Sequence, residues 1–151
     1  MKKTANWLIA SLISILMLGC GTPPPRLATP SGKPEILISG VTRKQVADAI
    51  VSDRLSSGFQ VKSVNDYTLV VVKDINDFAA QVVYGTKFNR VPETRITHSF
   101  AETGSGIRVY IRSEIVSNPN SQYESLTDFT ESWGGPAQDY LNRLKNALEK
   151  N

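Results

Sequence analysis

The sequence predicts an α+β fold, an antiparallel sheet of four to five strands with two main helices packed on one face. Two pairs of strand-like segments are each joined by a short turn, which is typical of antiparallel hairpins. Two other segments have helical periodicity with one apolar face each, and such faces must be buried on a sheet or on each other. The expected order of elements is β-α-β-β-(α)-β-β-α.

The first strand and the first helix follow each other closely. Residues 35–39 are mostly apolar and β-branched, which predicts a short strand that Gly40 ends. Thr42 suits the N-cap of a helix over residues 43–56, and Gly58 stands where a left-handed residue commonly ends a helix. The apolar face of this helix comprises Val46, Ala47, Ile50, Val51 and Leu55.

The first hairpin consists of residues 59–64 and 67–73 on either side of the turn candidate Asn65-Asp66. Residues 74–84 suit a short helix, although the end of this segment also suits a strand, and we favour the helix. Residues 85–92 are interpreted as a polar loop.

The second hairpin has the clearest alternation. Residues 94–100 place apolar side chains and His98 on one face and polar side chains on the other. Residues 103–106 form the turn, residues 107–116 return with the same alternation, and residues 118–121 end the strand. The last helix opens at Gly134-Gly135-Pro136, and its buried stripe comprises Tyr140, Leu141, Leu144, Ala147 and Leu148.

Over residues 35–150 this order of elements resembles the helix-grip class, which occurs in small domains of an outer-membrane assembly lipoprotein and in several lipid-binding families. The resemblance rests on element order and involves no motif. It implies that a small apolar or lipid ligand could be held between the sheet and the C-terminal helix.

Residues 1–19 have the three parts of a secretory leader. Lys2 and Lys3 form a positive start, and the uncharged run from Trp7 to Leu18 has the length of a signal-peptide core but is too short to cross a bilayer. Gly19 supplies the small side chain expected before a cleavage site. The sequence therefore predicts a signal peptide over residues 1–19.

The motif Leu16-Met17-Leu18-Gly19-Cys20 resembles the lipobox of bacterial lipoproteins, in which Leu is commoner than Met at the second position. The resemblance implies cleavage between Gly19 and Cys20, a diacylglyceryl group on the Cys20 sulfur and a third acyl chain on its amino group. Several acyl chains hold a protein on a membrane almost irreversibly. An ordinary signal peptide and an uncleaved N-terminal anchor are the alternatives.

Gly21 stands where the family's inner-membrane retention signal is typically Asp. The resemblance therefore implies an outer-membrane lipid anchor in a Gram-negative host, with the domain in the periplasm or at the cell surface. Residues 20–33 contain the lipidated cysteine and a proline-rich tether, which would span about 40 Å at ~3.1 Å per residue. Residues 34–151 then form a single globular α+β domain.

Composition excludes several classes of function. The chain has 17 basic and 14 acidic residues, and removal of Lys2 and Lys3 with the leader lowers the net charge from +3 to +1. The remaining basic residues are scattered, so we expect no nucleic-acid partner. The single cysteine cannot form an internal disulfide, and with one histidine it makes no zinc cluster, so neither a metal nor a cofactor is expected.

The sequence contains no recognisable catalytic constellation. His98 shares a face with apolar neighbours, and we interpret it as a structural residue. No spacing singles out an acid–base pair among the carboxylates considered, which are Glu93, Glu102, Glu114 and Asp128.

The polar face of the second hairpin is the candidate interaction surface, because arginine and tyrosine are enriched in interfaces. Its members are Arg95, Arg108, Tyr110 and Arg112. The alternative is a solvated sheet face shielded by long side chains. Trp133 is expected in the core, with a place at a pocket rim as the alternative.

The function predicted from the sequence is that of a membrane-anchored envelope lipoprotein with a non-enzymatic interaction or accessory domain. Its expected partners are the membrane, through acylated Cys20, and another envelope protein. The alternative is a carrier of a small apolar or lipid ligand between the sheet and the C-terminal helix.

Overall fold

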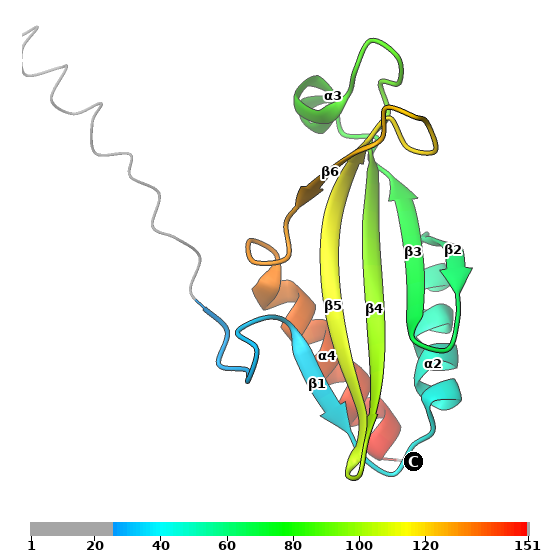
Figure 1. Cartoon of the computed structure of the whole chain (residues 1–151), viewed down its shortest axis with the longest axis vertical. Helices are drawn as coiled ribbons and strands as arrows, with labels where there is room; N and C mark the ends of the chain where they lie inside the picture. Colours follow the sequence, from blue (N-terminus) through cyan, green and yellow to red (C-terminus); the bar gives the residue numbers. More distant parts are fainter. Residues whose placement is uncertain (1–25, 151) are drawn as a thin grey trace, which may run out of the picture.

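The structure is a computed structural model and describes residues 26–150 (Figure 1). The leader over residues 1–19 and the lipid-anchor residue Cys20 lie outside the described residues. The described chain forms an antiparallel sheet with helices, so the predicted α+β class is confirmed.

The elements occur in the predicted order, with one addition. The bounds are β1 Glu35–Ile38, α2 Arg43–Ser56, β2 Gln60–Val64, β3 Thr68–Asp74, α3 Phe78–Tyr84, β4 Glu93–Thr103, β5 Gly106–Ser117, β6 Ser125–Asp128 and α4 Gly134–Glu149. The segment that suited either a helix or a strand is the helix α3. The addition is β6, a four-residue strand within a stretch whose sequence has little periodicity.

The sheet has the spatial order β1-β5-β4-β3-β2, and every pair of neighbours is antiparallel. The β4–β5 hairpin forms its long axis, because it is paired continuously from Glu93 opposite Val116 to Thr103 opposite Gly106. β1 pairs with the beginning of β5 and β6 pairs with its end, so the two short strands share one edge. The edge strand β1 therefore lies more than sixty residues before its neighbour β5 in the sequence.

Helices α2 and α4 cover the same face of the sheet, and the hydrophobic core lies between the two layers (Figure 1). The sheet contributes the inward residues of β3, β4 and β5, as the alternation predicts. The buried core comprises Ile38, Val46, Ile50, Leu69, Val71, Ile96, Phe100, Ile107, Val109, Ile111, Tyr140, Leu141 and Leu144. Burial of these side chains supplies the main driving force for folding.

Local capping sets the start of α2. The Thr42 hydroxyl accepts a hydrogen bond from the Gln45 amide at 3.2 Å, and Gln45 Oε1 accepts one from the Thr42 amide at 2.8 Å. This capping box satisfies two amides that a helix leaves free at its first turn. The helix ends before Gly58, which has a φ of 79° in the left-handed region.

Side chains of α4 cover the free edge of β1. Gln138 accepts a hydrogen bond from the Glu35 amide at 3.0 Å and donates one to the Glu35 carbonyl at 3.0 Å. Lys145 donates to the Leu37 carbonyl at 2.9 Å. An exposed strand edge can pair with other chains, so these bonds protect the edge while holding α4 on the sheet.

The end of the predicted tether lies against the domain. The Ser31 amide donates to Glu35 Oε1 at 2.9 Å, and the Leu27 side chain packs on the start of α4, where a Cβ on Gly134 would lie 3.2 Å from Leu27 Cδ1. Among the described residues, the segment from Leu27 onward is therefore part of the globular unit.

Candidate functional site

The four residues of the predicted interaction surface lie on the outer face of the β4–β5 hairpin, opposite the helices. Thr97, the neighbour of Arg95 on that face, is opposite Arg112, while Ser99 is opposite Tyr110 and Ala101 is opposite Arg108. The structure thus brings the predicted residues to one face.

Two of the three arginines on this face are neutralised by carboxylates. Arg95 binds Glu124 through two hydrogen bonds and also contacts Glu93 at 3.2 Å. Arg112 contacts Glu114 at 2.9 Å and Asp128 at 3.4 Å. Because their charges are satisfied within the domain, these arginines hold the sheet together and form a poor surface for a polyanion.

Arg108 and Tyr110 form the rest of this face, and both are partly exposed, whereas Arg112 is exposed. The pKa of the Arg108 guanidinium is raised by the neighbouring Tyr110 hydroxyl, so this side chain stays charged. A partly exposed cation beside a tyrosine is a common feature of a solvated face, and we do not place the functional site there.

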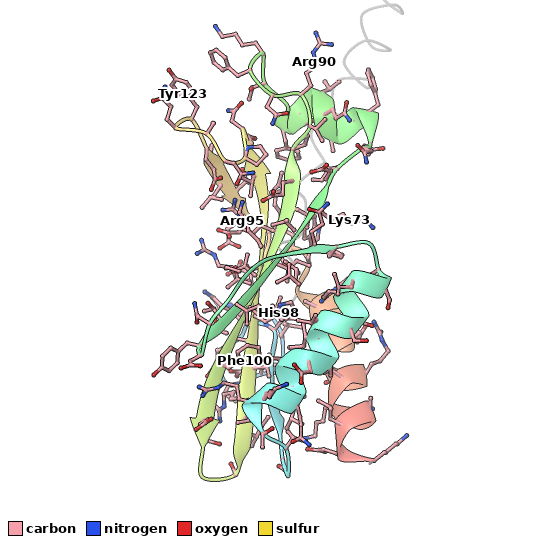
Figure 2. All side chains as sticks on the ribbon, turned by 90° about the vertical axis from the view of Figure 1, so that its right-hand side faces the viewer. Lys73, Arg90, Arg95, His98, Phe100 and Tyr123 are labelled. Atoms are coloured by element: carbon pink, nitrogen blue, oxygen red, sulfur yellow. The ribbon has the colours of Figure 1, made fainter. Side chains whose placement is uncertain are left out.

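The largest group of exposed apolar side chains lies at one end of the molecule, where α3 and two loops meet. We name Phe78, Val82, Val83, Phe88 and Tyr123 the apolar tip. Each of these five side chains is between 57% and 79% exposed. Figure 1 shows α3 and the two loops at the end of the β4–β5 hairpin that is far from its turn, and Figure 2 labels Tyr123 and Arg90 there.

The apolar side chains of helix α3 are not needed for the hydrophobic core, because none of its residues is buried. Asp77 caps it by accepting a hydrogen bond from the Ala80 amide at 2.9 Å, and every one of its residues is at least partly exposed. Tyr84 attaches the end of the helix to the domain through an edge contact with Phe129, with ring centroids 5.8 Å apart. Phe78 and Val82 are one turn apart and form a stripe on the helix that faces solvent.

A network of polar groups holds the two tip loops in place. The Thr86 hydroxyl donates to Asn118 Oδ1, and Asn118 Nδ2 donates to the Tyr123 carbonyl at 3.2 Å. The Ser121 hydroxyl donates to the Asn118 carbonyl at 2.8 Å. Asn118 is buried at the centre of this network, so the apolar side chains project from an ordered framework.

Two cations border the apolar tip. Lys87 Nζ lies 4.9 Å from the ring centroid of Phe88, and the Phe88 ring stacks on Tyr123 with centroids 5.3 Å apart. Lys87 and Arg90 are both exposed, and neither forms an ion pair with a carboxylate within residues 26–150. The tip therefore combines apolar area with unneutralised positive charge.

The other candidate residues are structural or lie elsewhere. His98 is fully buried, and burial, followed by the charge of Arg54, lowers its pKa to about 3, so it is a neutral core residue. Glu93 and Glu102 each pair with a cation of the domain. Trp133 stacks on Phe129 with ring centroids 5.0 Å apart, and it also lines a cavity. It thus has features of both alternatives, packing within the domain and a place at a pocket.

Sequence reasoning missed the apolar tip. Its residues come from a segment interpreted as a short helix, from a loop interpreted as polar, and from a stretch with little periodicity. The available signal was the density of large apolar residues in a segment that was predicted to contain no core-facing strand. Phe78, Val82, Val83 and Phe88 all lie within eleven residues of it.

No protein-family model matches the chain, and no curated protein matches its sequence. Across residues 26–150, no helix is long and apolar enough to cross a bilayer, and no cluster of His, Cys, Asp or Glu side chains has the geometry to hold a metal ion.

Proposed function

We propose that this chain is an envelope lipoprotein, held on the outer membrane by lipid on Cys20, whose domain is a non-enzymatic docking module. In this proposal the apolar tip binds another protein of the envelope. The observation that carries it is the gathering of five exposed, large apolar side chains on an ordered framework at one end of the domain. The motif Leu16–Cys20 supports the anchor through its resemblance to the lipobox.

Binding energy favours this surface over the sheet face. Burying a Val or Phe side chain contributes roughly 1.5–3 kcal/mol, and aromatic residues in the centre of an interface commonly dominate affinity. The framework around Asn118 limits the entropy that the tip would lose on binding. By contrast, a partner at the sheet face would have to displace the internal ion pairs of Arg95 and Arg112.

The charges at the tip indicate the kind of partner. Lys87 and Arg90 have no carboxylate partner within the described part of the chain, so a protein with an apolar patch and an acidic rim would complement them. The lipid on Cys20 would already hold the domain at the membrane, which leaves the tip free for a protein.

Site-specific photo-crosslinking in intact cells tests the proposal. Benzoylphenylalanine at position 88 is expected to give one discrete protein adduct, and the added substitution Val82→Asp should abolish it. The matched control is benzoylphenylalanine in place of Tyr67, another aromatic residue that is 70% exposed, in the turn between β2 and β3. Adducts to lipid alone at position 88, or the same protein adduct from both positions, would overturn the docking role.

The anchor is tested separately by mass spectrometry of the mature N-terminus. The expected species begins with Cys20 and carries the mass of a diacylglyceryl group and an acyl chain. An unmodified N-terminus would refute the lipoprotein part of the proposal without affecting the result at the tip.

A further inference from the structure

A cavity of about 470 Å³ lies between the second half of α2 and the first half of α4, above the middle of β4 and β5. We name it the α2–α4 cavity. Ile96 and Ile111 form its floor, and Trp133 and Ala137 are part of its wall on the α4 side. This volume is within the range of small-molecule sites, which are mainly apolar with a few polar groups.

Arg54 is the unusual residue of this cavity. Its guanidinium carbon lies 3.8 Å from the ring centroid of Tyr140 and 5.5 Å from that of Phe59. Within residues 26–150 it forms no ion pair, whereas Arg43, Arg95 and Arg112 each contact a carboxylate. A cation that is largely removed from water and lacks a counter-charge is destabilising unless something neutralises it.

Two polar atoms of these neighbouring side chains are poorly satisfied within the described residues, although Arg54 and Tyr140 contact each other. Arg54 Nε and the Tyr140 hydroxyl are buried, and neither makes a hydrogen bond of normal geometry within the described chain. Burial is the main cause that raises the pKa of Tyr140 to about 12, so its hydroxyl keeps its proton and can donate. Buried donors are nearly always satisfied in folded proteins, so, beyond the contact of the two side chains with each other, an acceptor placed between Arg54 and Tyr140 would suit this cavity.

The surrounding charges are consistent with an anionic ligand. The His98 and Tyr140 ring centroids lie 6.2 Å apart, and burial lowers the pKa of His98, which keeps the imidazole neutral. At the rim, Asp53 and Arg143 carry opposite charges and are both exposed. Since those two charges offset each other, the cavity retains the positive charge of Arg54.

We propose that the α2–α4 cavity binds a small amphipathic anion, in which a carboxylate contacts Arg54 and the Tyr140 hydroxyl and an apolar group lies against Ile96 and Ile111. The site is distinct from the apolar tip and does not depend on the docking function. It gives the domain a ligand as well as a partner.

Binding of 3-phenylpropanoate to the full chain in lipid nanodiscs tests this site. A Trp7→Phe background leaves Trp133 as the only tryptophan whether or not the leader is removed, so its fluorescence reports the cavity directly. Saturable binding is expected for the carboxylate, at least tenfold weaker binding for the uncharged amide 3-phenylpropanamide, and at least tenfold weaker binding for inorganic phosphate. Empty nanodiscs provide the baseline for partition into lipid.

Two variants and one control assign the binding to the site. Arg54→Gln should weaken 3-phenylpropanoate binding at least tenfold. The control Arg43→Gln removes another α2 arginine, which lies 5.8 Å from the Tyr67 ring and contacts Glu102 instead of the cavity, and it should leave binding unchanged. Ala137→Leu, which fills the cavity while leaving Arg54 in place, should abolish binding and provides the test if Arg54→Gln does not fold.

The proposal is overturned by any of three results. These are no saturable change in Trp133 fluorescence, equal affinity for the carboxylate and the amide, or equal affinity of the parent chain and a folded Arg54→Gln or Ala137→Leu variant. Phosphate binding as tight as that of 3-phenylpropanoate would also overturn it, because the apolar contacts would then contribute nothing.

Discussion

Arg95 and Glu124, 29 residues apart in the sequence, form a two-pronged ion pair in which Nη1 donates to Oε1 at 2.7 Å and Nη2 donates to Oε2 at 3.1 Å. The Arg95 hydrogen bond is the main cause that lowers the pKa of Glu124 to about 2. The pair joins the beginning of β4 to the loop that carries Tyr123. An arginine expected to face a partner therefore supports the framework of the apolar tip.

Replacing Glu124 with Gln should lower the free energy of unfolding by about 1 kcal/mol, because a two-pronged arginine–carboxylate pair is stronger than an ordinary surface pair. Urea unfolding at pH 7 measures the change. The control is Glu102→Gln, which removes an exposed carboxylate 3.7 Å from Arg43 and should change stability by less than ~0.5 kcal/mol. Equal effects of the two substitutions would contradict a structural role for the Arg95–Glu124 pair.

Stability should fall as the pH is lowered from 6.5, because burial lowers the pKa of His98 from 6.5 to about 3. In this window the unfolded chain binds a proton that the folded chain rejects, so the folded state loses relative stability. The expected loss is about 2 kcal/mol between pH 7.5 and pH 5, measured by urea unfolding. His98→Gln removes the titrating group, and a slope that persists in this variant would assign the effect to other residues.

Asn118→Ala should destabilise the apolar tip more than Asn120→Ala does. Both asparagines have a positive φ, 51° and 61°, so both substitutions carry a backbone penalty of roughly 1 kcal/mol. Only the Asn118 side chain bonds Thr86 and the Tyr123 carbonyl, and its loss should add about 1–3 kcal/mol. Hydrogen exchange at residues 85–92 measures the local effect, and equal exchange in the two variants would show that the network does not hold the loop.

The two glycines of the β4–β5 turn should differ sharply in tolerance. A Cβ at Gly106, where φ is 144°, would lie 2.2 Å from the Ile38 carbonyl oxygen, so Gly106→Ala must displace the end of β1. A Cβ at Gly104 would meet no atom within 4 Å. Gly106→Ala is expected to lower the free energy of unfolding by at least ~2 kcal/mol, and therefore to lower the melting temperature. Gly104→Ala should change the free energy of unfolding by less than ~0.5 kcal/mol. Thermal unfolding checks both, and similar melting temperatures would refute the close approach of β1.

Local patterns were sufficient for most of the elements. The alternation over residues 94–100 predicted which side of β4 faces the core, and the structure buries Ile96, His98 and Phe100 on that side. Thr42 and Gly58 predicted the two ends of α2. These features depend on backbone geometry and near neighbours, so a single sequence contains the information.

The candidate sites were much less predictable. The order of residues on β5 placed Arg108, Tyr110 and Arg112 on one face, but the carboxylate that neutralises Arg95 comes from Glu124, beyond the end of the hairpin. Likewise, the α2–α4 cavity depends on the packing of Arg54 over Tyr140, two residues that are far apart in the sequence. No spacing in the sequence connects such pairs.

The chain's own order of residues thus specified the α+β class, both hairpins and most of the inward faces of α2 and α4, because side-chain direction follows directly from helix and strand geometry. Leu55 and Ala147, predicted on those inward faces, are exceptions, because each lies on a part of its helix that the sheet does not cover and is exposed. Three-dimensional packing determined that β1 joins β5, that β6 extends the same edge, that Phe78 and Phe88 project into solvent, and that Arg54 packs over the Tyr140 ring. Those outcomes depend on which distant surfaces meet when the layers close. Whether a cation is paired, or an apolar side chain is buried, depends on the neighbours that the fold brings to it.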